Sequence, residues 1–296
     1  MRSSTVAVAA ISTGNGHKAR RAAPMWLLLP VTAFLLVFFL YPLLIILWRS
    51  FTDPSMGFEN YLALLHDGVS GTVLLRTLRT SLIVAVGTLI LAYPYAFAMT
   101  VVSARTRNLL TVLVLLPFWT SLMARNFAWY MVLQRGGPIN RLFDAIGVHD
   151  VVLLGTVAGV TIAMIQVMLP YMVLPLHSGM QGIDRRLLDA GTSLGAPRWR
   201  AFIQIYLPLS IPGVVSGFSL VFTMVLGFYI TPALLGSPQQ SLISQLIATH
   251  VTTLLDFGGA GALSAVLLAV TLLVLFAVSR IARPTASMSQ AVDRGW

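Results

Sequence analysis

The sequence predicts an all-α membrane protein with six transmembrane helices. Of its 296 residues, 57% are hydrophobic and only 9% are charged, whereas about 25% of the residues of a soluble domain carry charge. The apolar residues gather in six long runs, each near the length of about 20 residues that a helix needs to cross a bilayer. Short polar or basic segments separate the runs. The chain is therefore expected to work in contact with membrane lipid.

The six apolar runs define the expected spans. The first run is too long for the core of a signal peptide, and no small-residue cleavage site follows it. Pro94 and Pro117 are expected to kink or break the second and third spans. Two amphipathic segments, FENYLALL and SLISQLIATHVTTLL, lie outside the runs and are expected at a membrane interface. The predicted spans are residues 25–48, 80–102, 109–133, 151–176, 205–230 and 257–281.

The basic residues predict the orientation of the chain, because cytoplasmic loops carry an excess of Lys and Arg. With six spans, both termini lie on the same side. The segments 1–24, 103–108, 177–204 and 280–296 hold 13 of the 19 Lys and Arg residues, and the opposite side holds 6. Both termini are therefore expected in the cytoplasm. The net charge of +10 is scattered over segment ends rather than gathered in a stripe, so we do not expect a nucleic-acid partner.

A polar interval at 181–204 separates the fourth and fifth runs. Asp184 is placed to cap a helix, and Gly195 followed by Pro197 is a stop signal. We predict a short amphipathic helix outside the membrane, with small residues on the face that another protein could approach. An ordinary basic loop between spans is the alternative. The stripe of this helix consists of Ile183, Leu187, Ala190, Gly191 and Leu194.

The spacing within this interval resembles the loop signature of binding-protein-dependent ABC importer permeases. That signature is Glu-Ala-Ala, three residues, Gly, nine residues, Ile, one residue and Leu-Pro. Here Asp189 stands where the family usually has Glu, and Gly191 where it usually has the second Ala. In that family the loop is a coupling helix that sits in a groove of the cytoplasmic ATPase. The resemblance therefore implies that the coupling residues are Asp184, Leu188, Asp189, Ala190, Gly191, Leu194, Gly195, Ile205, Leu207 and Pro208.

Other stretches are similar to the permeases of spermidine and putrescine uptake. They are PFWTSLMARNFAWYMVL with the GGPIN that follows, and GFYITPALLG with GAGALSAVLL. The likeness implies the type I ABC importer permease (MetI-like) fold, in the bacterial inner membrane. It divides the chain into a tail at 1–24, a first helix at 25–48, an ABC transmembrane type-1 domain at 72–281 and a tail at 282–296. Its relatives also carry opines or amino-acid-like compounds, so the solute stays open.

The resemblance also implies the partners of the chain. They are two ABC ATPase subunits, a second homologous permease and a periplasmic solute-binding protein, which supplies most of the selectivity for the small-molecule substrate. No cofactor is expected.

The residues themselves indicate that the chain carries no energy source of its own. Its only lysine is Lys18, so no Gly-Lys-Ser/Thr phosphate-binding loop exists. No Asp or Glu lies inside the predicted spans, although ion-coupled carriers usually place acids there. An ion-coupled secondary transporter is the alternative function, and a membrane-embedded enzyme or scaffold is a more distant one. No catalytic constellation or metal-ligand spacing among the histidines is visible.

The polar and aromatic residues inside the spans are candidates for a substrate pathway. In the third span, helical spacing groups Trp119 with Asn126 and Tyr130 on one face, and Arg125 with Trp129 on another. We expect Trp129 to stack on Arg125. An intramembrane arginine suggests a functional site, but Arg125 could instead reach the outer interface, with the aromatic residues forming an interfacial belt. Three residues of later spans complete the candidates: Gln166, Phe228 and Tyr229.

Overall fold

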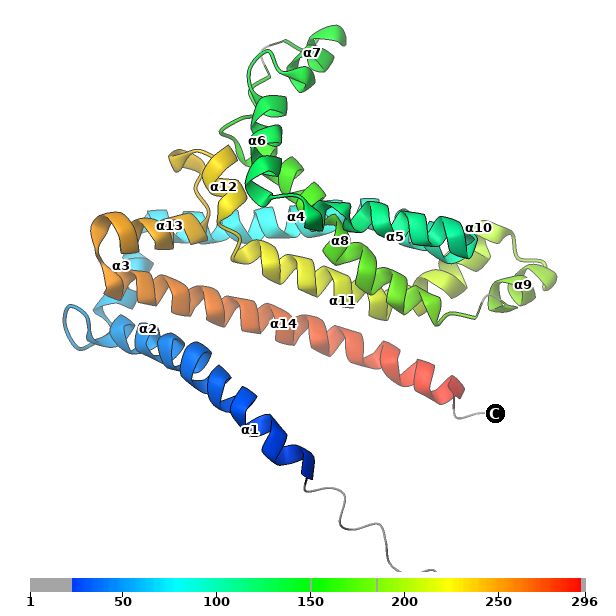
Figure 1. Cartoon of the computed structure of the whole chain (residues 1–296), viewed down its shortest axis with the longest axis horizontal. Helices are drawn as coiled ribbons and strands as arrows, with labels where there is room; N and C mark the ends of the chain where they lie inside the picture. Colours follow the sequence, from blue (N-terminus) through cyan, green and yellow to red (C-terminus); the bar gives the residue numbers. More distant parts are fainter. Residues whose placement is uncertain (1–22, 150, 185, 294–296) are drawn as a thin grey trace, which may run out of the picture. The chain divides into compact units, whose positions relative to one another are not determined.

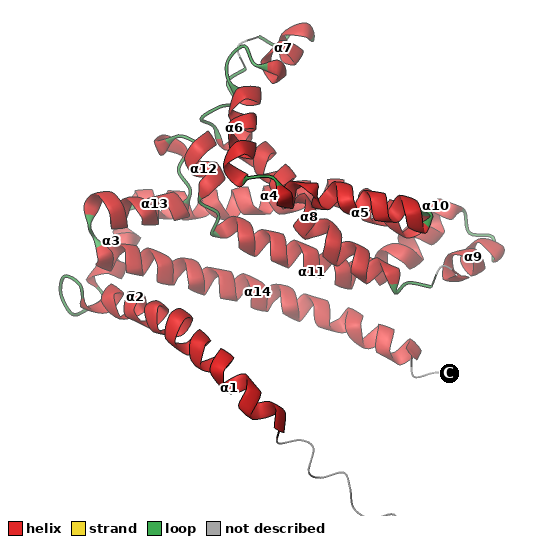
Figure 2. Cartoon of the chain, in the orientation of Figure 1, coloured by secondary structure: helices red, strands yellow, loops and turns green. Residues whose placement is uncertain are grey.

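The computed structural model describes residues 23–149, 151–184 and 186–293, and the part of the chain that it describes consists of helices and the loops between them, without strands (Figure 2). The chain forms two compact units, at 1–48 and 49–296. In the first unit, α1 (Ala23–Leu35) passes through a π-helical turn (Leu36–Leu40) into α2 (Tyr41–Thr52). Within this stretch, Leu29–Thr52 is long and apolar enough to span a membrane, as predicted for the first run. The predicted tail at 1–24 falls almost entirely outside the described residues.

The second unit contains the remaining helices, and their long members lie side by side in one bundle (Figure 1). Four of them, α4, α8, the α10–α11 stretch and α14, are long and apolar enough to span a membrane. Their bounds are α3 Glu59–His66, α4 Gly68–Val101, α5 Ala104–Trp119, α6 Leu122–Leu133, α7 Pro138–Ala145, α8 Val157–Gln181, α9 Arg186–Ser193, α10 Arg198–Ala201, α11 Leu207–Leu226, α12 Ile230–Leu235, α13 Ile243–Thr249 and α14 Phe257–Asp293.

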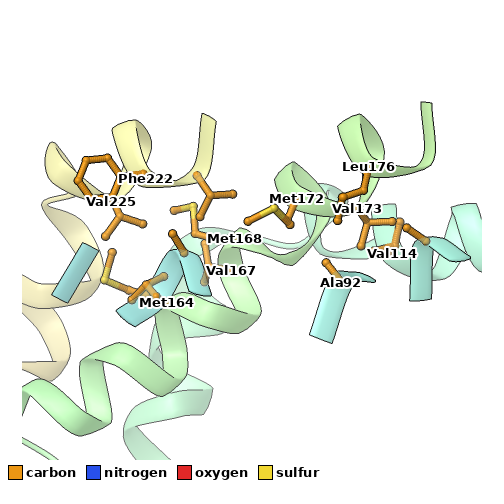
Figure 3. Close-up of a cluster of buried hydrophobic side chains, with 14 of the residues drawn as sticks. Ala92, Val114, Met164, Val167, Met168, Met172, Val173, Leu176, Phe222 and Val225 are labelled. Atoms are coloured by element: carbon orange, nitrogen blue, oxygen red, sulfur yellow. The ribbon is translucent and has the colours of Figure 1, made fainter. Parts of the chain in front are cut away.

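The core of the bundle lies where α8 packs against α4 and α11. Figure 3 shows side chains of α8 between Phe222 and Val225 of α11 at one end and Ala92 of α4 at the other. Three methionines at helical spacing carry much of this contact: Met164, Met168 and Met172, all fully buried. Flexible methionine side chains fill irregular gaps between helices well.

Small residues bring α8 and α11 together closely. A Cβ built on Gly179 of α8 would lie 2.8 Å from the Cα of Gly213 of α11, so a larger residue there would push backbone away from backbone. Close packing through small residues is the usual way that helices associate in membranes, where hydrophobic burial gives little preference for protein over lipid.

Asp67 and Asp256 organise the helix starts at one end of the bundle. Asp67 accepts hydrogen bonds from the Val69 and Ser70 amides at the start of α4, and the hydrogen bonds from the Ser70 hydroxyl and the Val69 amide hold its pKa below the usual range. Asp256 accepts from the Gly259 amide at 2.8 Å and from His250 at 2.9 Å. Burial alone would raise the pKa of Asp256, but the Gly259 and His250 bonds hold it below the usual value.

Five of the expected spans need correction. The second begins at Gly68 rather than at 80, because Asp67 caps the helix there. The fourth runs over Val157–Gln181 rather than 151–176. The fifth ends at Leu226, and the predicted residues after it lie in the break before α12, which begins at Ile230. The sixth continues beyond 281 to Asp293, so helix extends into the predicted tail. The third is not one helix: α5 and the helices that follow meet at a bend of 94°. The described residues hold five candidate spans, or six if this bent pair counts as one.

Candidate functional site

The predicted helix between the fourth and fifth spans exists as α9, and its ends follow local rules. Asp184 accepts a hydrogen bond from the Arg186 amide at 2.9 Å, close to the predicted cap. At the other end, Gly195 has a φ of +91°, a backbone conformation that favours glycine. The Gly195 amide donates to Thr192 O and the Ala196 amide donates to Gly191 O. This pair of bonds is the Schellman motif, which ends helices.

One face of α9 packs on its own chain rather than being free for a partner. A Cβ built on Gly191 would lie 2.8 Å from Cδ1 of Ile205 and 3.6 Å from Cβ of Ala201. Leu188 packs against the main core. The expectation that the small residues face another protein is therefore wrong for Gly191, whereas Ala190 is exposed. Because Gly191 has no side chain, α9 can lie close to the segment that carries Ile205.

The C-terminal end of α9 and the turn after it expose large apolar side chains next to arginines. Leu194 is 89% exposed and Trp199 is 62% exposed. The guanidinium of Arg200 lies 5.4 Å from the centre of the Trp199 ring. Asp189, Leu207 and Pro208 are exposed as well. An apolar knob ringed by charge is the kind of surface that docks in a groove of another protein.

This surface lies at one end of the bundle. Figure 1 shows α9 and α10 at the end where α14 finishes, whereas α3 and α13 lie at the other end. Arg105 and Arg107 lie in the first turn of α5. This turn comes directly after the C-terminal end of α4, the end that lies far from α3. The fold therefore gathers loops that the sequence predicted for one side of the membrane at one end of the second unit.

The bend between α5 and α6 explains what Arg125 does. Its Nη2 donates to Pro117 O, to Thr120 O at 3.3 Å and to Thr120 Oγ1 at 3.1 Å. These oxygens belong to the C-terminal end of α5, whose last carbonyls lack helical partners and carry the negative end of the helix dipole. The guanidinium thus stabilises the broken end of the helix. The predicted stack on Trp129 is wrong, since the cation–π pairs of the described residues do not include Arg125.

The bend also changes which of the other candidate pathway residues lie together. Trp129 of α6 donates from Nε1 to Oε1 of Gln166 of α8 at 3.3 Å, so the structure brings these two candidates together. Asn126 is 1% exposed and donates to Leu122 O. Trp119 belongs to α5 rather than α6 and is exposed, as is Tyr130. The expected grouping assumed one continuous helix, so Trp119 does not belong to it, whereas Asn126 and Tyr130 both lie on α6, four residues apart.

Phe228 and Tyr229 lie in the short break between α11 and α12. The Phe228 carbonyl accepts a hydrogen bond from Ser244 at 2.8 Å. Tyr229 lines an open, mostly apolar groove of about 450 Å³ together with Ser244 and Thr252. Sequence analysis missed Ser244 and Thr252, as it missed Thr120 beside Arg125. Only the tertiary fold brings them to these places, and no local signal marks them.

The comparisons with known proteins agree with this arrangement. Residues 97–286 match the family model described as "Binding-protein-dependent transport system inner membrane component". The spermidine/putrescine transport system permease protein PotB of Escherichia coli K12 is 31% identical over 268 residues, covering 86% of this chain and 97% of PotB. The inner membrane ABC transporter permease protein YdcU of the same organism is 29% identical, covering 72% of this chain and 74% of YdcU.

A solved structure gives the same fold. A chain of a bacterial alginate ABC transporter, in complex with a periplasmic protein that binds an alginate pentasaccharide, superposes with a TM-score of 0.74 at 19% identity. The superposition covers 89% of this chain and 95% of that one. The MetNI methionine ABC transporter superposes with a TM-score of 0.55 at 14% identity, covering 71% of this chain and 93% of that one. These likenesses confirm the predicted all-helical, MetI-like fold. The chain belongs to the family of binding-protein-dependent transport system inner membrane components, as a multi-pass permease subunit of an ABC importer.

Proposed function

We propose that this permease carries a polyamine such as spermidine or putrescine across the bacterial inner membrane, in preference to related amines, opines or amino-acid-like compounds. The support is PotB, a spermidine/putrescine transport system permease protein, whose sequence matches this one over most of both chains. The chain pairs with a second homologous permease, two ATPase subunits and a periplasmic binding protein. ATP hydrolysis takes place on the partner chains, since the only lysine of this chain, Lys18, offers no phosphate-binding loop.

The helix α9 is the proposed contact with an ATPase subunit. Its exposed Leu194, with Trp199 beyond it, forms the part that enters the ATPase groove, and Asp189 lies beside it. The buried side of α9, at Gly191 and Leu188, rests on the transmembrane bundle. When the ATPases close, they push α9, and the spans move with it from an inward-facing to an outward-facing arrangement. Both termini and α9 lie in the cytoplasm in this proposal.

The proposed solute route passes the polar contact between α6 and α8. Trp129 and Gln166 form this contact, and the buried Asn126 lies one turn away on α6. Phe228 and Tyr229 lie near one end of the route. Arg125 lies beside the route, where it stabilises the end of α5 and does not itself contact the solute.

The single observation that carries the function is the family match together with an exposed α9 at one end of the bundle. The test compares Leu194→Asp with Leu142→Asp in the full transporter. Leu142 of α7 is 66% exposed, so the two variants make the same change on two exposed surfaces. A charge in a docked apolar contact is expected to weaken ATPase binding at least about thirtyfold, which corresponds to the loss of one interface hot spot.

We expect Leu194→Asp to lose the ATPase on co-purification and to stop uptake of labelled spermidine, whereas Leu142→Asp retains the ATPase. Unchanged co-purification of Leu194→Asp would contradict the docking role of α9. If the wild-type transporter binds its ATPase but takes up neither spermidine nor putrescine, the proposed solute class is wrong. Uptake that survives depletion of ATP would instead favour an ion-coupled carrier.

A further inference from the structure

Four aromatic rings join the segment beneath α9 to span α4. Phe202 and Tyr206 lie in the π-helical turn Phe202–Tyr206 that leads into α11, and their rings stack with centres 5.4 Å apart. Phe97 of α4 meets both rings edge-on, at 5.2 Å from Phe202 and 5.1 Å from Tyr206. Tyr93, one turn earlier on α4, meets Phe202 edge-on at 6.3 Å. We call Tyr93, Phe97, Phe202 and Tyr206 the aromatic joint.

Hydroxyl groups hold the joint in one arrangement. The Tyr93 hydroxyl forms a hydrogen bond with the Ser210 hydroxyl of α11 at 2.9 Å, and the Tyr206 hydroxyl lies 3.5 Å from Oγ1 of Thr100 on α4. Ser210 is fully buried and Tyr206 is 2% exposed. Both bonds therefore cross from α4 to the start of the fifth span and lie within protein rather than lipid.

The joint adjoins the segment on which α9 packs. Ile205, the residue that Gly191 of α9 approaches, is part of the same π-helical turn as Phe202 and Tyr206. A push on α9 reaches Ile205 first, and the rings beside it lie between that turn and α4. Short π-helical segments are rare in proteins and occur frequently at functional sites.

We propose that the aromatic joint transmits the displacement of α9 to α4, so that α4 moves together with α11 when the ATPases close. Edge-to-face rings have a defined geometry, unlike aliphatic side chains that slide and repack. The joint makes two helices respond as one body to a push on a third. This inference rests on the proposed contact of α9 with the ATPase.

The test measures how much ATP the transporter consumes for each solute molecule imported. Phe97→Leu and Phe202→Leu remove one ring each from opposite sides of the same contact and retain an apolar side chain. Phe276→Leu makes the same change on α14, where the ring is 58% exposed and lies 4.8 Å from the Arg280 guanidinium, outside the joint. All variants are assayed as the complete transporter in proteoliposomes with its binding protein.

We expect the two joint variants to bind the ATPase normally but to consume at least about fivefold more ATP per imported solute, the lower end of the range for energetic coupling between sites. Phe276→Leu keeps the wild-type ratio. The effect of the double variant is expected to fall short of the sum of the two single effects, since both single variants remove the contact between Phe97 and Phe202. A wild-type ratio in either assembled variant would overturn the inference, as would effects of the two variants that simply add.

A milder change keeps the test valid if the leucine variants fail to assemble. Tyr93→Phe retains the ring and removes only the hydroxyl bond to Ser210, so it is expected to raise the ratio less than Phe97→Leu. A wild-type ratio for Tyr93→Phe under those conditions would contradict the inference. Failure of the joint and failure of the α9 contact are distinguishable, because only the second allows Leu194→Asp to keep its ATPase.

Discussion

Two glycines four residues apart make opposite demands on the chain. Gly191 lies inside α9, where a built Cβ would lie too close to the flexible end of Ile205 and at an ordinary contact distance from Ala201. Gly195 ends the helix with a φ of +91° and has open space around it. The space around the residue therefore limits substitution at Gly191, whereas the backbone conformation limits substitution at Gly195. The same substitution to alanine separates the two effects.

Gly191→Ala is expected to stabilise α9 by up to about 1 kcal/mol, since alanine is the better helix former and the Ile205 methyl can move aside. Gly195→Ala is expected to destabilise the helix end by roughly 1–2 kcal/mol, the cost of a left-handed conformation for an L-residue. Hydrogen exchange of the α9 amides measures both, with about fivefold slower exchange for each 1 kcal/mol gained. Equal responses of the two variants would contradict this assignment.

The third span is broken between α5 and α6, and Arg125 stabilises the end of α5 at this break. Arg125→Met removes the donor from Pro117 O and the Thr120 oxygens while it keeps an apolar side chain. We expect the free energy of unfolding to fall by about 0.5–1.5 kcal/mol, the net value of a hydrogen bond, because Pro117 O still accepts from the Thr120 amide and hydroxyl. The apparent affinity for solute in uptake is expected to stay unchanged. Thermal unfolding and uptake kinetics of the purified, reconstituted transporter measure the two quantities.

Two further variants separate structure from solute binding at this site. Arg79→Met removes an exposed arginine of α4 and is expected to leave the unfolding temperature as it is. Arg125→Lys retains the charge and is expected to restore part of the lost stability. A change in solute affinity with normal stability for Arg125→Met would show instead that Arg125 binds the solute.

The elements differ in how far sequence alone could predict them. The signals that begin and end α9 are local, so Asp184 and Gly195 were enough to predict where the helix begins and ends. The bend after Trp119 is not local: Pro117 indicated a break, but its angle depends on Arg125 folding back and on α6 packing against α8 and α12. The contact between Trp129 and Gln166 joins residues far apart in the sequence. Helical periodicity could not predict this contact, because periodicity groups residues within one helix and Trp129 and Gln166 lie on different helices.

At the scale of the whole molecule, the proposed mechanism requires α9 and α7 to lie on opposite sides of the membrane. The chain contains no cysteine, so a single introduced thiol reports its own position without background. Leu194→Cys on the α9 end and Leu142→Cys on α7 are both strongly exposed. A maleimide that cannot cross membranes is expected to label Leu142→Cys from the periplasm, and Leu194→Cys only in inverted vesicles.

The same labelling experiment also tests whether the ATPase covers α9. If α9 sits in a groove of that subunit, the Leu194→Cys thiol is protected in the assembled transporter and reacts once the ATPase has been stripped from the vesicles. The Leu142→Cys thiol reacts equally in both cases. Labelling of Leu194→Cys from the periplasm would place α9 where no cytoplasmic ATPase can reach it. The arginines around α9 would then lie outside, against the charge asymmetry that oriented the chain, and the coupling role would fail together with the aromatic joint that depends on it.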